Sequence, residues 1–177
     1  MRRVGGIFAV FMLAACGFQP LYVQRTSGNA WYYDGQFDTS IADEMSQIKI
    51  SSIADRFGQQ LRNDLLDLIT PRGTPRQAKY RLDVKLADKA VTQQAMRDDV
   101  TATSERIEYL VEYRLFQGAN QLVAGNSIAF VSYDILSNPY STTMAQKKAE
   151  TDAAKIIAND IALRIGAYFH TQMSRNK

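Results

Sequence analysis

The chain has 177 residues, of which 46% are hydrophobic and 22% are charged, the balance of an ordinary globular domain. Its formal net charge of +3 is too small to indicate nucleic-acid binding. With one cysteine and one histidine, the sequence excludes an intramolecular disulfide and a metal site built from several such ligands.

Residues 1–15 have the pattern of a signal peptide that is cleaved after export. Arg2 and Arg3 form a positive start, and the largely apolar run over residues 4–12 is too short to span a bilayer. Leu13-Ala14-Ala15-Cys16 then matches the lipobox of lipoprotein precursors, in which an aliphatic and two small residues precede the cysteine. An ordinary signal peptide, or an anchor helix, with a chance cysteine is the alternative.

Cys16 is therefore predicted to become the lipidated N-terminus of the mature protein. It would carry diacylglycerol on its sulfur and an acyl chain on its amino group, and no other cofactor is expected. Two or three acyl chains give stable anchoring, since each buried methylene contributes roughly 0.8 kcal/mol. Gly17 replaces the aspartate that often retains lipoproteins in the inner membrane, which favours the periplasmic face of the outer membrane.

Residues 16–45 predict a lipidated tether without a defined helix or strand, because glycine, proline and asparagine interrupt it. Aromatic side chains are interleaved along this tether. They could dock on the protein's own domain, on a partner or at the membrane interface, and the sequence leaves these three options open. The remainder, residues 46–177, is expected to form a single domain.

The first elements of that domain are predicted to be a strand, a helix and a second strand. Alternation of polar and apolar residues over 46–51 indicates a strand. Ser52-Ile53-Ala54-Asp55 resembles a capping box, and apolar residues at helical spacing then predict an amphipathic helix over 54–69. Strict alternation over 80–86 predicts a strand with one buried face.

The next part of the chain is expected to complete an antiparallel meander. Residues 88–104 contain few large apolar side chains and are interpreted as a long polar connection. Alternation predicts strands over 107–115 and 122–133, joined by a short turn at Gly118-Ala119-Asn120.

A long final helix is predicted over residues 141–172. Its apolar residues step by four, with alanines in the first half and bulkier side chains in the second, so the first half must approach the sheet closely: Ala145, Ala149, Ala153, Ile157, Ile161, Ile165 and Phe169. The element order is then β-α-β-β-β-α. We therefore predict an α+β two-layer sandwich, with two helices on one face of a four-stranded, mostly antiparallel sheet.

Enzymatic activity is not expected. Asp64 and Asp67 could form an acid–base pair, but the helix pattern places them on a polar surface with nothing to bury them and shift their pKa values. His170 falls in the last turn of the final helix, where a cation favourably opposes the helix dipole. No nucleophile elbow, phosphate-binding glycine loop or metal motif is present in the sequence.

Basic side chains are expected to gather on the sheet face that points away from the helices. Lys85, Arg106 and Arg114 lie there by alternation, and Lys89 and Arg97 in the 88–104 segment could join them. Two interpretations stay open. The bases could form cross-strand ion pairs with acidic neighbours, or their guanidinium and ammonium groups could bind phosphates.

The start of the mature chain, Cys16-Gly17-Phe18-Gln19-Pro20-Leu21-Tyr22, resembles that of the lipopolysaccharide-assembly lipoprotein family, LptE. The similarity continues more weakly through residues 55–63, residues 80–84, Ser132-Tyr133-Asp134 and the alanine-rich final helix. In outline it covers the whole mature chain.

This resemblance implies a sandwich of two helices on a four-stranded sheet. It also implies a non-enzymatic plug inside the outer-membrane β-barrel LptD, which helps the barrel assemble and helps lipopolysaccharide reach the outer leaflet. Some members bind lipopolysaccharide through basic residues, for which the candidates here are Lys85, Lys89, Arg97, Arg106 and Arg114. The polar sheet face and residues 88–104 are expected to meet the barrel lumen. The alternative is an auxiliary lipoprotein of a lipid-transport ABC system.

Overall fold

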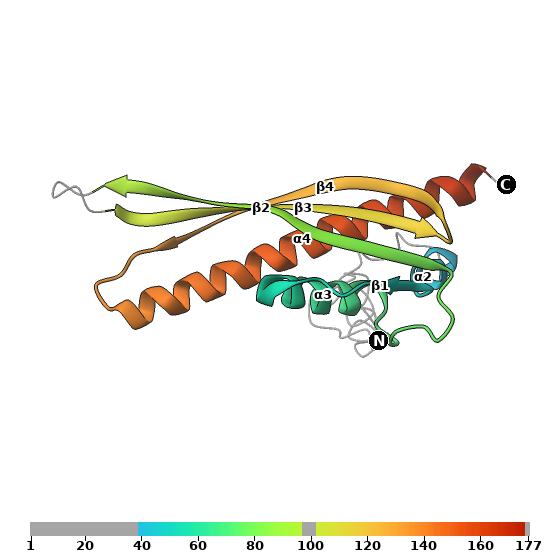
Figure 1. Ribbon diagram of the computed structural model, residues 1–177, viewed down its shortest axis with the longest axis horizontal. Helices are drawn as coiled ribbons and strands as arrows, with labels where there is room; N and C mark the ends of the chain where they lie inside the picture. Colours follow the sequence, from blue (N-terminus) through green and yellow to red (C-terminus); the bar gives the residue numbers. More distant parts are fainter. Residues whose placement is uncertain (1–38, 97–101, 176–177) are drawn as a thin grey trace, which may run out of the picture. The chain divides into compact units, whose positions relative to one another are not determined.

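The computed structural model describes residues 39–96 and 102–175, which belong to one compact unit of the chain, Trp31–Lys177 (Figure 1). The predicted signal peptide, Cys16 and most of the predicted tether lie outside the described residues. Nothing in the fold therefore tests the predicted boundaries at residues 15 and 45.

Four strands form one mixed sheet in the order β1-β2-β3-β4. The strands are β1 (Ile48–Ile50), β2 (Tyr80–Met96), β3 (Ala102–Gln117) and β4 (Asn120–Asp134). β1 pairs with β2 in parallel, whereas β2–β3 and β3–β4 are antiparallel. The predicted meander is confirmed, and the parallel β1–β2 pair is reached through a helical crossover.

Two helices cover one side of this sheet: α3 (Asp55–Ile69) and the long α4 (Pro139–Arg175) (Figure 1). α4 packs mainly on β4 and on α3, and α3 also contacts β1. The α+β sandwich and the element order β-α-β-β-β-α are thus confirmed, apart from one additional helix before β1.

The buried stripe on α4 follows the predicted steps of four from Ala149 to Phe169. A second buried stripe of small residues runs beside it: Ala154, Ala158, Ala162 and Gly166. Small side chains let a helix approach its neighbours closely, so α4 can contact both α3 and β4 with its buried positions between Ala149 and Phe169. The core also holds a stacked aromatic pair, Phe57 and Tyr109, with ring centroids 4.1 Å apart.

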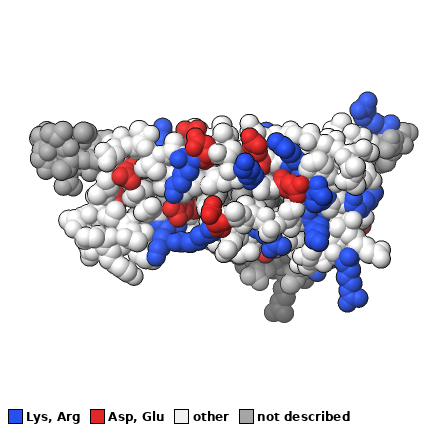
Figure 2. Space-filling model, in the orientation of Figure 1, with Lys and Arg blue, Asp and Glu red and all other residues white. Residues whose placement is uncertain are grey.

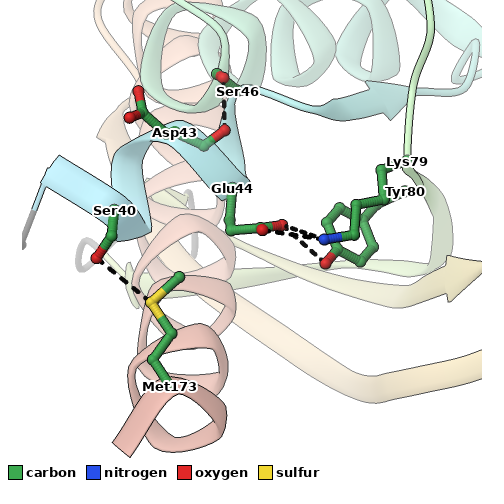
Figure 3. Close-up of polar contacts among 7 residues, drawn as sticks. All are labelled: Ser40, Asp43, Glu44, Ser46, Lys79, Tyr80 and Met173. Carbon is green, nitrogen blue, oxygen red and sulfur yellow. Dashed lines mark hydrogen bonds and ion pairs between the residues drawn. The ribbon is translucent and has the colours of Figure 1, made fainter. Parts of the chain in front are cut away.

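The additional helix, α2 (Thr39–Met45), lies in the segment for which no helix or strand was predicted. Its two large apolar residues belong to the core: Ile41 is 1% exposed and Met45 is 3% exposed. Figure 3 shows that Glu44 of α2 accepts hydrogen bonds from the Nζ of Lys79, at 3.0 Å, and from the hydroxyl of Tyr80, at 2.8 Å. α2 is therefore held by burial of its apolar residues in the core, where it packs on α4, and by the contacts of Glu44 at the start of β2.

Residues 88–104 do not form the polar connection that the sequence predicted. β2 continues to Met96 and β3 begins at Ala102, and the pairing runs on through Gln94 opposite Ser104. The prediction was wrong because main-chain pairing between two strands does not require large apolar side chains. In β2 every residue from 87 to 93 is exposed. The sequence of this part therefore does not alternate between apolar and polar residues as a strand with one buried face does.

A β-bulge between Leu86 and Asp88 is a second reason why this part of β2 was not recognised as a strand from the sequence. Before the bulge, Leu82 and Val84 face the core; after it, Lys89 and Val91 pair with buried β3 residues and take the core-facing side. An extra residue in one strand exchanges its two faces, because side chains alternate with a period of two.

The predicted capping box at the start of α3 is also not formed. The residue that caps the helix is Ala54, which makes no side-chain hydrogen bond to the helix start. Asp55 has φ 67°, in the left-handed region, so the chain enters α3 through a turn that Ser52 does not cap. None of the helices in the described part of the chain is long and apolar enough to cross a membrane.

Candidate functional site

The outward face of the sheet, opposite the helices, is the candidate site. Cross-strand rows on this face follow from the register: Asp83–Arg114–Ala124, Lys85–Glu112–Asn126, Asp88–Leu110–Ile128, Ala90–Glu108–Phe130 and Thr92–Arg106–Ser132. Three of the five predicted basic site residues, Lys85, Arg106 and Arg114, therefore share this face as predicted. All three side chains are exposed.

Some of these bases are neutralised by acidic neighbours. Arg114 lies 3.6 Å from Glu112, and Arg81 lies 3.2 Å from Asp83, whose other oxygen accepts a hydrogen bond from Ser51. In Figure 2 basic and acidic side chains are interspersed in the view shown. Both pairs join residues two positions apart on one strand, so this part of the outward face carries ion pairs, but not the cross-strand pairs that were predicted. Each such exposed pair contributes about 1 kcal/mol or less.

Arg106 differs from Arg81 and Arg114 in the residues that surround its guanidinium group. Within residues 39–96 and 102–175 it forms no ion pair, and its guanidinium carbon lies 5.7 Å from the centre of the Phe130 ring. Phe130 is 55% exposed, and the neighbouring Ile128 is 48% exposed. With the half-buried Leu110, these two residues form what we call the outer apolar patch.

The outer apolar patch and Arg106 together can bind an amphiphile. A guanidinium makes paired hydrogen bonds to a phosphate, while exposed aromatic and branched side chains contact hydrocarbon. Arg106 was predicted from the sequence to lie on this face, whereas Ile128 and Phe130 were not predicted as part of the site. The signal was present, since both stand at outward positions of the alternating strand where polar residues are the rule.

Lys89 does not join this site, because the bulge turns it to the opposite face. Its Nζ lies 3.3 Å from Glu150 of α4 and 5.3 Å from the centre of the Tyr109 ring. Burial opposes its charge, but the contacts with Tyr109 and Glu150 outweigh this and raise the pKa of Lys89. Lys89 therefore links the sheet to α4. The other two predicted site residues, Arg97 and Cys16, lie outside the described residues.

Asp64, which we expected to be exposed, is partly buried on α3. Burial raises the pKa of its carboxyl group, while a hydrogen bond from Gln60, at 3.1 Å, and the charge of Lys155 act in the opposite direction. The expectation that nothing shifts this pKa was wrong, because α3, a helix of about four turns beside β1, buries more than its apolar stripe. Asp67 is exposed.

Two comparisons place this fold among known proteins. The sequence model of the family described as lipopolysaccharide-assembly, LptE, matches residues 45–165, more than half of the chain. The chain belongs to the LptE family. The resemblance read from the sequence is thereby confirmed, and the general role of the LptE family, lipopolysaccharide assembly, applies to this chain.

Solved structures share the fold of this LptE-family chain. A protein of Caulobacter crescentus described as a lipoprotein is 24% identical, with a TM-score of 0.59, over 73% of this chain and 96% of that one. A minor lipoprotein from Acinetobacter baumannii is 13% identical, with a TM-score of 0.52, over 69% of this chain and 92% of that one. No curated protein matches the sequence.

Proposed function

We propose that this LptE-family chain is the lipid-anchored plug subunit of the lipopolysaccharide export complex, held within the outer-membrane β-barrel LptD. There it would assist assembly of the barrel and delivery of lipopolysaccharide to the outer leaflet. The match to the LptE family over residues 45–165 carries this proposal. The protein would act by binding rather than by catalysis.

In this proposal Cys16 supplies the anchor. Processing before Cys16 would leave a lipidated N-terminus on the periplasmic face of the outer membrane, and the acyl chains would be its only covalent additions. The lipobox and the family match support this assignment independently, because the matched region begins at residue 45.

The outward face would provide the contact surface. A barrel interior is polar and wet, which suits the interspersed charges along β2 and β3. Lipopolysaccharide combines phosphate groups with acyl chains, so Arg106 and the outer apolar patch could meet both parts of one molecule.

Affinity purification of the full lipoprotein from detergent-solubilised envelope tests the proposed function. We expect an outer-membrane β-barrel protein to be recovered with it. A control in which Cys16 is replaced by serine should be recovered without the lipid and should not fractionate with the outer membrane. Recovery of an inner-membrane permease in place of the barrel would favour the ABC-system alternative and refute the plug.

Direct contact with lipopolysaccharide is tested by Arg106→Glu. The substitution removes the guanidinium that lies over Phe130, so binding of purified lipopolysaccharide should weaken about tenfold, the effect of about 1.4 kcal/mol. Arg76→Glu is the matched control, because it makes the same change of charge at an exposed position in the loop between α3 and β2. Equal binding by both variants would remove Arg106 from the site.

A further inference from the structure

β4 is an edge strand that lacks a second partner. It pairs with β3 along its length, and no other strand of the described chain pairs with it. Figure 1 shows β4 as the outermost strand on its side of the sheet. Alternate residues of β4 therefore direct their N–H and C=O groups away from the sheet, as a template on which a further strand could pair.

The opposite edge of the sheet carries devices that discourage such pairing. β1 is only three residues long and its central residue, Lys49, is exposed. Beyond β1, the free part of β2 contains the bulge at Leu86 and Asp88 together with Lys85 and Lys89. Short strands, charges and bulges are the means by which natural sheets protect their edges.

β4 has none of these protective features over most of its length. Residues 121–133 contain no charged residue and no proline. The stretch from Ser127 to Tyr133 is rich in β-branched and aromatic residues, and its pairing with β3 is regular. Ile128 and Phe130 also expose apolar side chains along this edge. The edge formed by β1 and β2 is thus protected against pairing with a further strand, whereas the β4 edge is open to it.

The space beside β4 suits a single extended strand better than a second copy of this chain. α4 packs directly under β4, where Ser127 and Ala129 are buried. If two copies paired through β4, their strands would lie about 4.8 Å apart. Their α4 helices would then lie under adjacent strands, closer than the roughly 8–10 Å that packed helices need.

We propose that the β4 edge accepts an extended, uncharged segment of the barrel partner as a fifth strand of the sheet. Main-chain hydrogen bonds would supply affinity, and apolar side chains of the added strand would lie beside Ile128 and Phe130 and widen the outer apolar patch. An uncharged segment fits this edge because residues 121–133 carry no charge with which a charged side chain of the added strand could pair. The identity of the partner rests on the proposed function, whereas the open edge does not.

A photo-activatable side chain at Phe130 tests the location of the contact. The matched control is Leu163, an apolar residue of α4 that is 50% exposed and does not lie on the outward face of the sheet. In intact envelopes of cells carrying the full lipoprotein, we expect the variant at 130 to crosslink to the barrel protein about tenfold more than the variant at 163. Equal crosslinking, or crosslinking at 130 to a second copy of this chain, would overturn the proposal.

The substitutions Phe130→Lys and Leu163→Lys give an independent test. Both replace an exposed apolar side chain with a lysine, so circular dichroism should show both variants folded. We expect recovery of the barrel to fall about tenfold for Phe130→Lys and to be unchanged for Leu163→Lys, which lies on α4 and off the outward face. Unchanged recovery for Phe130→Lys would refute the edge contact alone, while failure of the unsubstituted protein to recover a barrel would refute the proposed function.

Discussion

Polar side chains join β4 to β3 and β2 to α4. The hydroxyl of Tyr133 on β4 donates a hydrogen bond to Glu105 on β3, and Lys89 on β2 reaches Glu150 on α4. Burial, followed by the negative charges of Glu105 and Glu150, raises the pKa of Tyr133 to about 12. These contacts hold together a region whose strands have little apolar surface to bury.

Tyr133→Phe should lower the free energy of unfolding by about 1–2 kcal/mol at pH 7, because Glu105 loses its donor. The pKa of Tyr133 is higher in the folded protein than in the unfolded chain. Its contribution is therefore complete below pH 10 and is lost as pH rises from 10 to 12. Urea unfolding at pH 7 and pH 11 should show that the difference between the two proteins shrinks. Tyr140→Phe, at an exposed tyrosine, is the control, and a difference that is the same at both pH values would contradict this account.

At the scale of elements, two glycines allow a neighbouring side chain to come close to the backbone of a helix or strand. Gly58 is buried within α3 and faces Ile53, which precedes the helix. A Cβ added at Gly58 would lie 2.5 Å from the Cγ2 of Ile53. Gly125 of β4 is similarly close to the ring of Tyr113 on β3, its register partner. Both glycines are needed for contact rather than for backbone freedom.

Gly58→Ala should destabilise the protein by about 1–3 kcal/mol, although alanine is the better helix former by about 1 kcal/mol. The clash with Ile53 outweighs the gain in helix propensity because Ile53 is itself buried. Thermal and urea unfolding would measure the change. Asn63→Ala, on the exposed side of the same helix, is the control and should be neutral or slightly stabilising. A more stable Gly58→Ala protein would show that the space at Ile53 is larger than described.

At the scale of the whole molecule, α2 joins the core that the sheet and the other helices form. Ile41 and Met45 complete the core beside Ile48, and Glu44 binds the start of β2. Ser40 contacts Met173 near the end of α4, as Figure 3 shows. α2 thus brings together the beginning of the described chain and its last helix.

Replacing Ile41 and Met45 with alanine in the full chain should lower the free energy of unfolding by at least about 4 kcal/mol, because each side chain is almost completely buried. Urea unfolding of the full chain gives the measurement. Asp43→Ala, at an exposed position of the same helix, should have an effect below about 0.5 kcal/mol. Similar stability of the two variants would mean that α2 does not contribute to the folded domain.

The sequence by itself determined the α+β class, the element order and the two helices on one face. These follow from periodicities of 2 and 3.6, which burial of one face imposes along the chain. It also indicated the family, through the residues that follow Cys16, and placed Lys85, Arg106 and Arg114 on one face. Alternation alone fixes such a placement as long as a strand stays regular.

Only the tertiary structure decided the rest. The bulge after Leu86 places Lys89 on the side of the sheet that faces the helices. The types of the residues in a strand do not predict where such an extra residue falls. α2 forms because the core beside β1 buries Ile41 and Met45; its seven residues would not be stable as an isolated helix. The open edge of β4 is a property of strand order, because pairing between distant parts of the chain determines which strand is left without a neighbour.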